Sequence, residues 1–178
     1  TLASSLNYGR YSRTEEIAYH DNPEHWLLGQ VKQVTQTSPA PSVVMSQTDY
    51  DAADLPWRQY RFGWLQHTLI YNADSTLTTV TDGENNTTML SNWKRGIPQI
   101  IRDANGATQI AAVDDNGWVR SIMDKNGFAT QYDYDTMGRI TLVDYPDGDT
   151  VDWASTVSNF ALATASQHGL PAGHWKQT

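Results

Sequence analysis

Between Tyr71 and Ala154 the sequence repeats itself four times with a fixed length of 21 residues. The rows align without a gap and read YNADSTLTTVTDGENNTTMLS (71–91), NWKRGIPQIIRDANGATQIAA (92–112), VDDNGWVRSIMDKNGFATQYD (113–133) and YDTMGRITLVDYPDGDTVDWA (134–154). One such short unit cannot bury its apolar side alone, but consecutive units laid side by side can. We therefore expect the rows to stack.

Two columns of this alignment predict tight turns, because Gly and Asn tolerate the positive φ that such turns need. One column holds Ser75, Gly96, Gly117 and Gly138, and the other holds Asn85, Gly106, Gly127 and Gly148. The segments between the turns are rich in β-branched and aromatic residues, so each row predicts two strands. The four rows together predict a growing antiparallel sheet with one hairpin per row.

Two apolar columns lie three residues apart within the rows. The first holds Leu77, Pro98, Val119 and Ile140, and the second holds Val80, Ile101, Ile122 and Val143. Residues three apart lie on opposite faces of a regular strand. The pattern therefore predicts either a bulge between the columns or a sheet with both faces partly covered, and Pro98 favours a bulge in the second row.

The pattern is weaker on both sides of the four rows. Tyr50–Ile70 forms a fifth, degenerate row, in which Gly63 lies one place early, and we expect an irregular turn at 62–64. Trp26–Thr35 resembles a degenerate copy of 138–144. We expect one sheet over 1–178, with irregular leading strands (1–49), five rows (50–154) and trailing strands (155–178).

The flanking segments give further local predictions. A turn is expected at Tyr8–Arg10, a strand that ends at 20–23, and a loop or bulged edge at the Pro-containing segment 38–42. After Ala154 we favour strand over helix for 155–167 and expect a turn at 169–173. The last residues, His174–Thr178, predict a strand whose partner is missing.

Composition excludes several classes of function. The chain has 178 residues, a net charge of −8, 12 scattered Lys and Arg residues and no Cys. Nucleic-acid binding is not expected without a clustered basic face, nor are disulfides or thiolate metal sites. No apolar run approaches the length of a membrane span. Seven Trp, nine Tyr and three Phe predict an aromatic-rich core. The chain starts without Met, and we expect it to be a piece of a longer protein.

No motif predicts a catalytic, cofactor or metal site. Asp103–Gly106 and Asp124–Gly127 resemble the first half of a calcium loop, with Asp114 and Asp135 at the twelfth position, but turn chemistry explains them equally and is the better interpretation. Nucleophile-elbow, phosphate-loop and dinucleotide motifs are absent. The histidines lack metal-protease spacing and are expected at surface or strand positions: His20, His25, His67, His168 and His174.

The tryptophans allow two interpretations. They are Trp57, Trp64, Trp93, Trp118 and Trp153. An indole face complements the apolar face of a sugar ring, so exposed tryptophans would form a carbohydrate platform. Packing between stacked strands is favoured, because three of these residues lie within the repeat rows.

These residues resemble the bacterial Rhs/YD-repeat family, which is named for a Tyr-Asp pair followed by Gly-Arg and Asp-Gly turns. Tyr134–Thr141, continued by Tyr145–Gly148, matches that pattern in full. The segments 92–106, 113–119 and 124–127 match it in part. The segment 21–29 also resembles a stretch that is common in these proteins, and the resemblance as a whole covers Ile17–Trp153.

The resemblance implies an all-β fold of repeated antiparallel β-hairpins in a curved or spiralling YD-repeat sheet, a fragment of a larger β-shell. In Tc insecticidal toxins and Rhs proteins such a shell encloses a toxic C-terminal segment, and teneurins use a similar shell in adhesion. Nothing in the chain matches the self-cleavage motif of the family, so no catalytic residue is implied.

The leading hypothesis is a non-enzymatic structural segment of a secreted or cell-surface bacterial protein. Its expected partners are neighbouring YD repeats, a possible encapsulated C-terminal toxin, and a second copy paired through open sheet edges. The alternative is a carbohydrate- or cell-surface-binding module that uses exposed Trp and Tyr. No cofactor is expected.

Overall fold

The computed structural model describes residues 2–8, 11–147 and 153–178, and for residues 2–8, 11 and 12 only the backbone. The predicted turns at Gly9–Arg10 and Gly148 lie outside the described residues. Within them the secondary structure consists of β-strands and one short 3-10 helix, which confirms the all-β prediction. Contacts divide the chain into two units, 1–90 with 103–105 and 91–102 with 106–178. The proposed boundaries at 49/50 and 154/155 stay a prediction.

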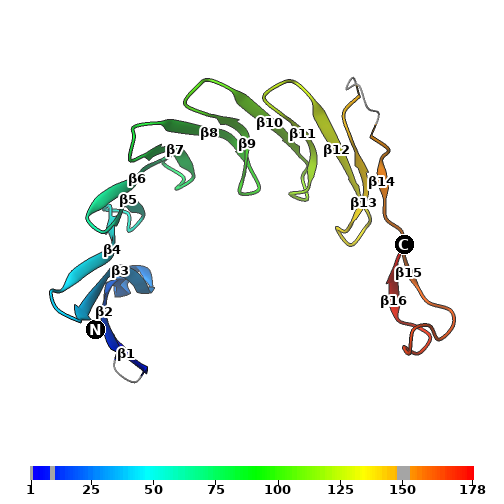
Figure 1. Cartoon of the computed structure of the whole chain (residues 1–178). Coiled ribbons are helices and arrows are strands. Elements are labelled where there is room, and N and C mark those ends of the chain that lie inside the picture. Colours follow the sequence, from blue (N-terminus) through cyan, green and yellow to red (C-terminus); the bar gives the residue numbers. More distant parts are fainter. Residues whose placement is uncertain (1, 9–10, 148–152) are drawn as a thin grey trace. The chain divides into compact units, whose positions relative to one another are not determined.

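In the first unit, antiparallel strands are hydrogen-bonded in the order in which they occur in the chain (Figure 1). They are β1 (Leu2–Tyr8), β2 (Tyr11–Asn22), β3 (Leu27–Ser38), β4 (Val43–Tyr50), β5 (Pro56–Arg61), β6 (Trp64–Tyr71), β7 (Leu77–Asp82) and the first half of β8 (Thr87–Lys94), with helix η1 (Pro23–His25) between β2 and β3. The predicted strand that ends near Pro23 is confirmed, and so is the predicted loop for 39–42, while Ser38 is the last residue of β3.

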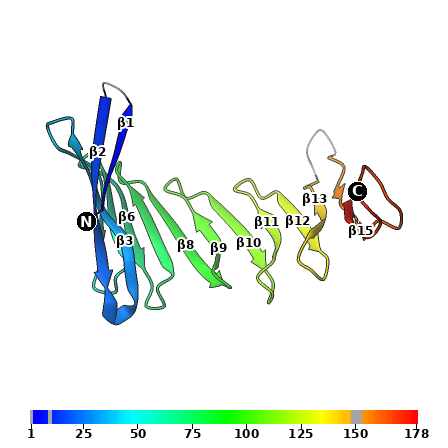
Figure 2. The same ribbon diagram turned by 90° about the horizontal axis from the view of Figure 1, so that it is seen from below.

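The second unit continues the same order from the second half of β8. Its strands are β9 (Ile97–Arg102), β10 (Thr108–Val113), β11 (Val119–Met123), β12 (Ala129–Tyr134), β13 (Ile140–Asp144) and β14 (Thr156–Val157), and a separate two-stranded sheet holds β15 (Phe160–Leu162) and β16 (Trp175–Gln177). Figure 2 shows the hairpins β10–β11 and β12–β13 side by side. The expectation that 174–178 lacks a partner is wrong, because β16 pairs with β15.

The turn columns are confirmed wherever they are described. Ser75, Gly96, Gly117 and Gly138 have φ values of 66°, 79°, 86° and 80°, and Asn85, Gly106 and Gly127 have 67°, 84° and 88°. Each row from 71 to 133 therefore contributes two strands, joined by a turn that needs a left-handed residue.

The bulge between the apolar columns is confirmed in three rows. Opposite Tyr71 the register shifts so that Leu77 and Thr79 pair with consecutive residues and Thr78 is extra. Equivalent shifts leave out Arg120 and Thr141. Because one extra residue restores the phase, the two apolar columns share a face of the sheet. The bulge at Pro98 stays a prediction.

The degenerate fifth row contains a tight turn, and the predicted irregular turn at 62–64 is wrong. Phe62 and Gly63 have φ values of 50° and 78° between the paired residues Arg61 and Trp64. Two positive φ values identify a two-residue hairpin turn that matches the twist of the strands. The irregularity lies in the strands, where the register shifts next to Gln59.

The predicted aromatic-rich core is also wrong for the described residues. Among them only Val113 and Ala163 are buried apolar side chains, with 6% and 3% of their surface exposed. Contacts between the named elements are almost all contacts between neighbouring strands, so the described residues of each unit form no second layer over the sheet. Some aromatic side chains pack along the sheet, as Trp118 does on Tyr134, and others, such as Trp64, are exposed.

Candidate functional site: the Tyr-Asp turns

The Tyr-Asp pair that opens the fourth row, Tyr134-Asp135, places its Asp at the first position of a five-residue turn. In the fourth row the N–H of Asp135 donates to Arg139 O (3.0 Å) and the N–H of Gly138 donates to Asp135 O (3.0 Å). The carboxylate oxygen Oδ1 of Asp135 accepts from the N–H groups of Met137 (2.9 Å) and Arg139 (3.0 Å). One carboxylate thus satisfies two backbone donors and fixes the turn.

The same geometry recurs along one edge of the strands. We call the turns 51–55, 72–76, 114–118 and 135–139 the Tyr-Asp turns. Asp51 and Asp114 repeat both carboxylate contacts, while Asn72 keeps the two backbone bonds. The second row departs from the pattern with a two-residue turn at Arg95 and Gly96.

Hydrogen bonds hold the turn carboxylates ionised. The N–H of Arg139 lowers the pKa of Asp135 below its usual value of 3.8, and the Arg139 guanidinium adds to this against the opposing effect of burial. At the opposite edge, Asp82 and Asp124 begin turns of the same kind. Their carboxyl pKa values are lowered chiefly by Asn86 and by the N–H of Phe128. The half calcium loop at 124–127 is therefore a turn whose Asp is used by its own backbone.

The Tyr of each pair reaches the preceding hairpin. The hydroxyl of Tyr71 donates to Pro56 O (2.7 Å) and that of Tyr134 donates to Val119 O (2.8 Å). Tyr50 makes the equivalent bond to Val31 O (3.1 Å). Burial raises the pKa of these tyrosines above 10.0, so they are neutral donors at ordinary pH.

Side chains of one Tyr-Asp turn pack on the next. Trp118 stacks on Tyr134 with ring centroids 5.3 Å apart, and the guanidinium of Arg120 lies over both rings. A Cβ at Gly138 would approach the Trp118 indole to 3.2 Å. Gly138 therefore serves both the left-handed turn and the close approach of Trp118.

The turn at Arg95 and Gly96 contacts the Tyr-Asp turn 114–118 in a similar way. Arg95 donates from Nε to Asp115 O (2.9 Å), and Lys94 Nζ lies 2.9 Å from Asp115 Oδ1. A Cβ at Gly117 would lie 3.3 Å from Arg95 Cβ. Consecutive turns along this edge are therefore in direct contact.

The structure brings together two histidines that sequence reasoning treated as isolated. His20 Nε2 lies 2.7 Å from Asp54 Oδ1, and His25 Nδ1 lies 2.7 Å from Asp54 Oδ2, which also accepts a 2.7 Å hydrogen bond from Asn22 Nδ2. Asp54 has φ 61° and a side chain only 7% exposed. Hydrogen bonds from His25 and His20 lower the pKa of Asp54 to about 2. These hydrogen bonds connect the end of β2 and helix η1 to the Tyr-Asp turn 51–55.

No sequence signal pointed to this cluster, because its members come from segments about 30 residues apart. His67 lies in the groove described below. His174 contacts Pro171 O through Nδ1 at 2.7 Å. In the part of the chain that the structure describes, no three His, Cys, Asp or Glu residues form a group that could hold a metal ion.

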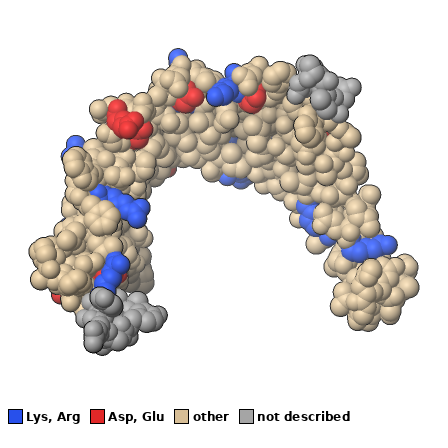
Figure 3. Space-filling view, in the orientation of Figure 1, with Lys and Arg blue, Asp and Glu red and all other residues tan. Residues whose placement is uncertain are grey.

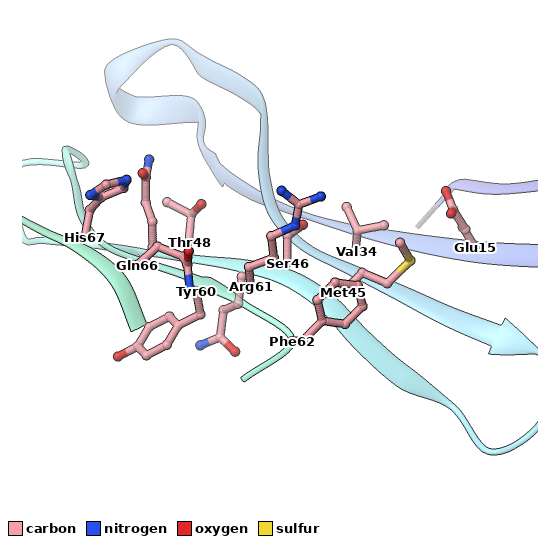
Figure 4. Close-up of a pocket in the computed structure, with 12 residues that line it drawn as sticks. Glu15, Val34, Met45, Ser46, Thr48, Tyr60, Arg61, Phe62, Gln66 and His67 are labelled. Atoms are coloured by element: carbon pink, nitrogen blue, oxygen red, sulfur yellow. The ribbon is translucent and has the colours of Figure 1, made fainter. Parts of the chain in front are cut away.

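An open groove of about 510 Å³ crosses strands β2 to β6 in the first unit (Figure 4). Its wall is mixed, with the apolar side chains of Val34 and Phe62 beside polar groups such as Thr48, Arg61 and His67. Among the described residues the Arg61 guanidinium forms no ion pair, so the groove carries unpaired hydrogen-bond donors. It resembles a weak polar binding surface more than an enclosed active site.

Charged side chains are dispersed over a mostly uncharged surface on the face drawn in Figure 3. This agrees with the scattered Lys and Arg residues of the sequence and gives that face no extended basic patch. Among the described residues we also find no helix with the length and apolarity needed to traverse a bilayer.

The tryptophans divide between the two interpretations. Trp118 packs on Tyr134 as expected, and Trp57 and Trp93 are partly buried, Trp57 lying under the Arg58 guanidinium. The prediction that the tryptophans pack between strands is wrong for Trp64, which is 77% exposed, and for the exposed Trp153. Trp26, which was not among the candidates, is 88% exposed with φ 56°.

The repeating turns have a counterpart among known families, because residues 113–150 match the family model described as RHS Repeat. The segment 113–150 is an RHS repeat. The matched segment contains two Tyr-Asp turns with their Asp–Arg pairs, which confirms the resemblance to the Rhs/YD-repeat family. A search of curated proteins gave no match.

Solved structures show where the fold of this chain occurs. The crystal structure of TcdB2-TccC3-Cdc42 matches 85% of this chain with a TM-score of 0.59 at 12% identity, over 9% of that chain. A Photorhabdus luminescens Tc holotoxin pore structure with a mutation in TccC3 matches 74% of this chain and 9% of its own, with a TM-score of 0.40 and 13% identity. The chain thus spans a small part of the structures it matches, and the first match confirms the YD-repeat β-fold.

Proposed function

We propose that this chain is a wall segment of a β-shell that encloses or displays a C-terminal effector of its parent protein. The observation that carries the proposal is the locking of successive rows through the Tyr-Asp turns. Tyr134 bonds Val119 of the previous hairpin, and Gly138 lies against Trp118. Such contacts fix each row on its neighbour without a second layer.

A wall differs from a sandwich domain in that both faces of the sheet stay accessible. The chain meets this condition, since only Val113 and Ala163 among the described side chains are buried apolar residues. Exposed apolar side chains such as Ile70 and Met89 remain on the strands. In a complete shell, one face would meet solvent and the other an enclosed segment.

The fold likeness to part of TcdB2-TccC3-Cdc42 supports this role, since this chain aligns with 9% of that much longer chain. A wall segment needs no catalytic group, and we propose that the chain is not an enzyme. Neighbouring repeats of the parent chain are its proposed partners, and the parent is proposed to be secreted or displayed on the cell surface.

Protease protection tests the proposal. The parent protein with the segment that follows the repeats is digested, and that segment should resist cleavage while the shell is intact. Ile122→Pro removes a ladder donor from β11 and should open the wall. Lys125→Ala, in an exposed turn, is the matched control and should leave protection unchanged. If the segment after the repeats is cleaved as fast in the parent protein as in Ile122→Pro, encapsulation is excluded.

A second candidate is a carbohydrate- or surface-binding module, which the groove and the exposed Trp26 and Trp64 favour. Against it, these two residues lie at opposite ends of the strands and form no line on one sheet face. A glycan array probed with the intact chain and with Arg61→Ala decides between the candidates. Binding that depends on Arg61 would support the module, and no binding would leave the wall segment.

A further inference from the structure

One side chain of the fourth row attaches the separate hairpin β15–β16 to the sheet. Among the described strands, β15 and β16 pair only with each other. Asn159 and Thr178 close the hairpin with reciprocal backbone bonds of 2.7 and 2.9 Å. The guanidinium carbon of Arg139 lies 4.3 Å from the ring centroid of Phe160 and 4.5 Å from that of Trp175.

The face of the hairpin turned to Arg139 is aromatic. Phe160 pairs with Gln177 and Leu162 pairs with Trp175. Alternate residues of a strand share a face and so do paired residues. Phe160 and Trp175 therefore stand on one face of the hairpin, diagonal to each other, and both rings contact the same guanidinium.

Asp135 holds Arg139 in this position. Its Oδ2 accepts from Arg139 Nε at 2.7 Å and lies 2.6 Å from Nη2. A guanidinium fixed by two bonds to a carboxylate loses less rotamer freedom when it stacks on a ring. Asp135 is therefore at once the first residue of the turn and the support of the Arg139 contact.

The same arrangement occurs one row earlier. Arg120 Nε and Nη2 each lie 2.8 Å from Asp114 Oδ2, and the guanidinium lies 5.4 Å from Trp118 and 5.3 Å from Tyr134. There the second ring is the Tyr of the next Tyr-Asp pair. An Arg that is bound to an Asp of its own row thus contacts an aromatic ring of the following row.

We propose that Arg139 is a docking site for paired aromatic rings and that hairpin β15–β16 caps the stack of Tyr-Asp turns by filling this site with Phe160 and Trp175. Phe160 and Trp175 of the hairpin contact Arg139 in the same way as Tyr134 contacts Arg120. Where the 21-residue pattern of this chain ends, the hairpin covers the Tyr-Asp turn of the fourth row through side chains, and among the described strands it leaves the backbone edge of β14 open. The inference is independent of what the parent protein encloses.

Hydrogen exchange of the backbone amides, measured by mass spectrometry on the whole chain, tests the cap. Arg139→Met keeps the length of the side chain but removes its charge. It should speed exchange in 160–177 roughly three- to tenfold, as expected when a cation–π contact to two rings is lost. Arg120→Met is the matched control and should leave 160–177 unchanged.

A second variant approaches the contact from the other side. Phe160→Leu combined with Trp175→Leu keeps apolar volume in the hairpin, leaves the sheet unaltered and removes both π faces. It should speed exchange in 160–177 to the same extent, which guards against general unfolding of Arg139→Met. Unchanged exchange in this double variant, or equal effects of Arg139→Met and Arg120→Met on 160–177, would overturn the cap.

Discussion

The hydroxyl of Tyr134 donates a 2.8 Å hydrogen bond to the carbonyl oxygen of Val119, a residue of the preceding hairpin. Val119 lies beside the bulge at Arg120 and pairs with Val113, which is one of the two buried apolar side chains among the described residues. The Tyr of a Tyr-Asp pair thus acts on the row before its own. Turn chemistry and stacking are joined in one residue pair.

Tyr134→Phe should therefore destabilise the second unit. Removal of one neutral hydrogen bond costs about 0.5–1.5 kcal/mol in the free energy of unfolding. The control is Tyr132→Phe, because the Tyr132 hydroxyl makes no hydrogen bond to the described residues. Urea unfolding followed by circular dichroism should separate the two variants, and equal midpoints would contradict the role of the Tyr134 bond.

Gly138→Ala should cost more stability than Gly127→Ala. Both residues have positive φ, 80° and 88°, so each substitution carries the strain of a left-handed residue, about 1–2 kcal/mol. Only at Gly138 does the new Cβ meet a neighbour, the Trp118 indole at 3.2 Å. A larger fall in Tm for Gly138→Ala is the expected result, and equal falls would show that Trp118 yields without cost.

Asp135→Ala should destabilise the fourth row much more than Asp135→Asn. The Ala variant leaves the N–H groups of Met137 and Arg139 without their acceptor, whereas the Asn variant offers an amide oxygen in the same place. Thermal unfolding of both variants checks this. Equal effects would assign the role of Asp135 to its charge alone.

The cluster around Asp54 predicts a dependence of stability on acid. The pKa of the Asp54 carboxyl is lowered from 3.8 to about 2 in the folded chain, so the unfolded state binds the proton more tightly. The stabilisation is fully present above pH 3.8 and is lost as the pH falls through about 2. The Tm difference between the natural chain and Asp54→Asn should therefore shrink between pH 5 and pH 2. A constant difference over this range would refute the assignment.

The edge at β14 predicts self-association. Val157 is exposed on a two-residue strand at the end of the strand order, and an open edge pairs with further strands. Light scattering at high protein concentration should show dimers or larger species, and Val157→Lys should lower their share. A strict monomer in the natural chain would contradict pairing through the edges.

The sequence alone determined the strands and turns of this protein, because both depend on local chemistry. A glycine such as Gly117 adopts positive φ without a steric penalty, and the 21-residue spacing repeats such a residue from row to row. The phase change between Leu77 and Val80 likewise predicted a bulge. The predicted aromatic core failed because composition does not reveal whether a sheet has a second layer.

Only the tertiary structure decided which side chains meet. His20, His25 and Asp54 lie on separate elements, and only the pairing of β2 with β3, β3 with β4 and β4 with β5 brings them to one edge. The contact of Arg139 with Trp175 depends in the same way on the path of the chain after β14. Such contacts follow from register and chain path, which a local sequence pattern does not specify.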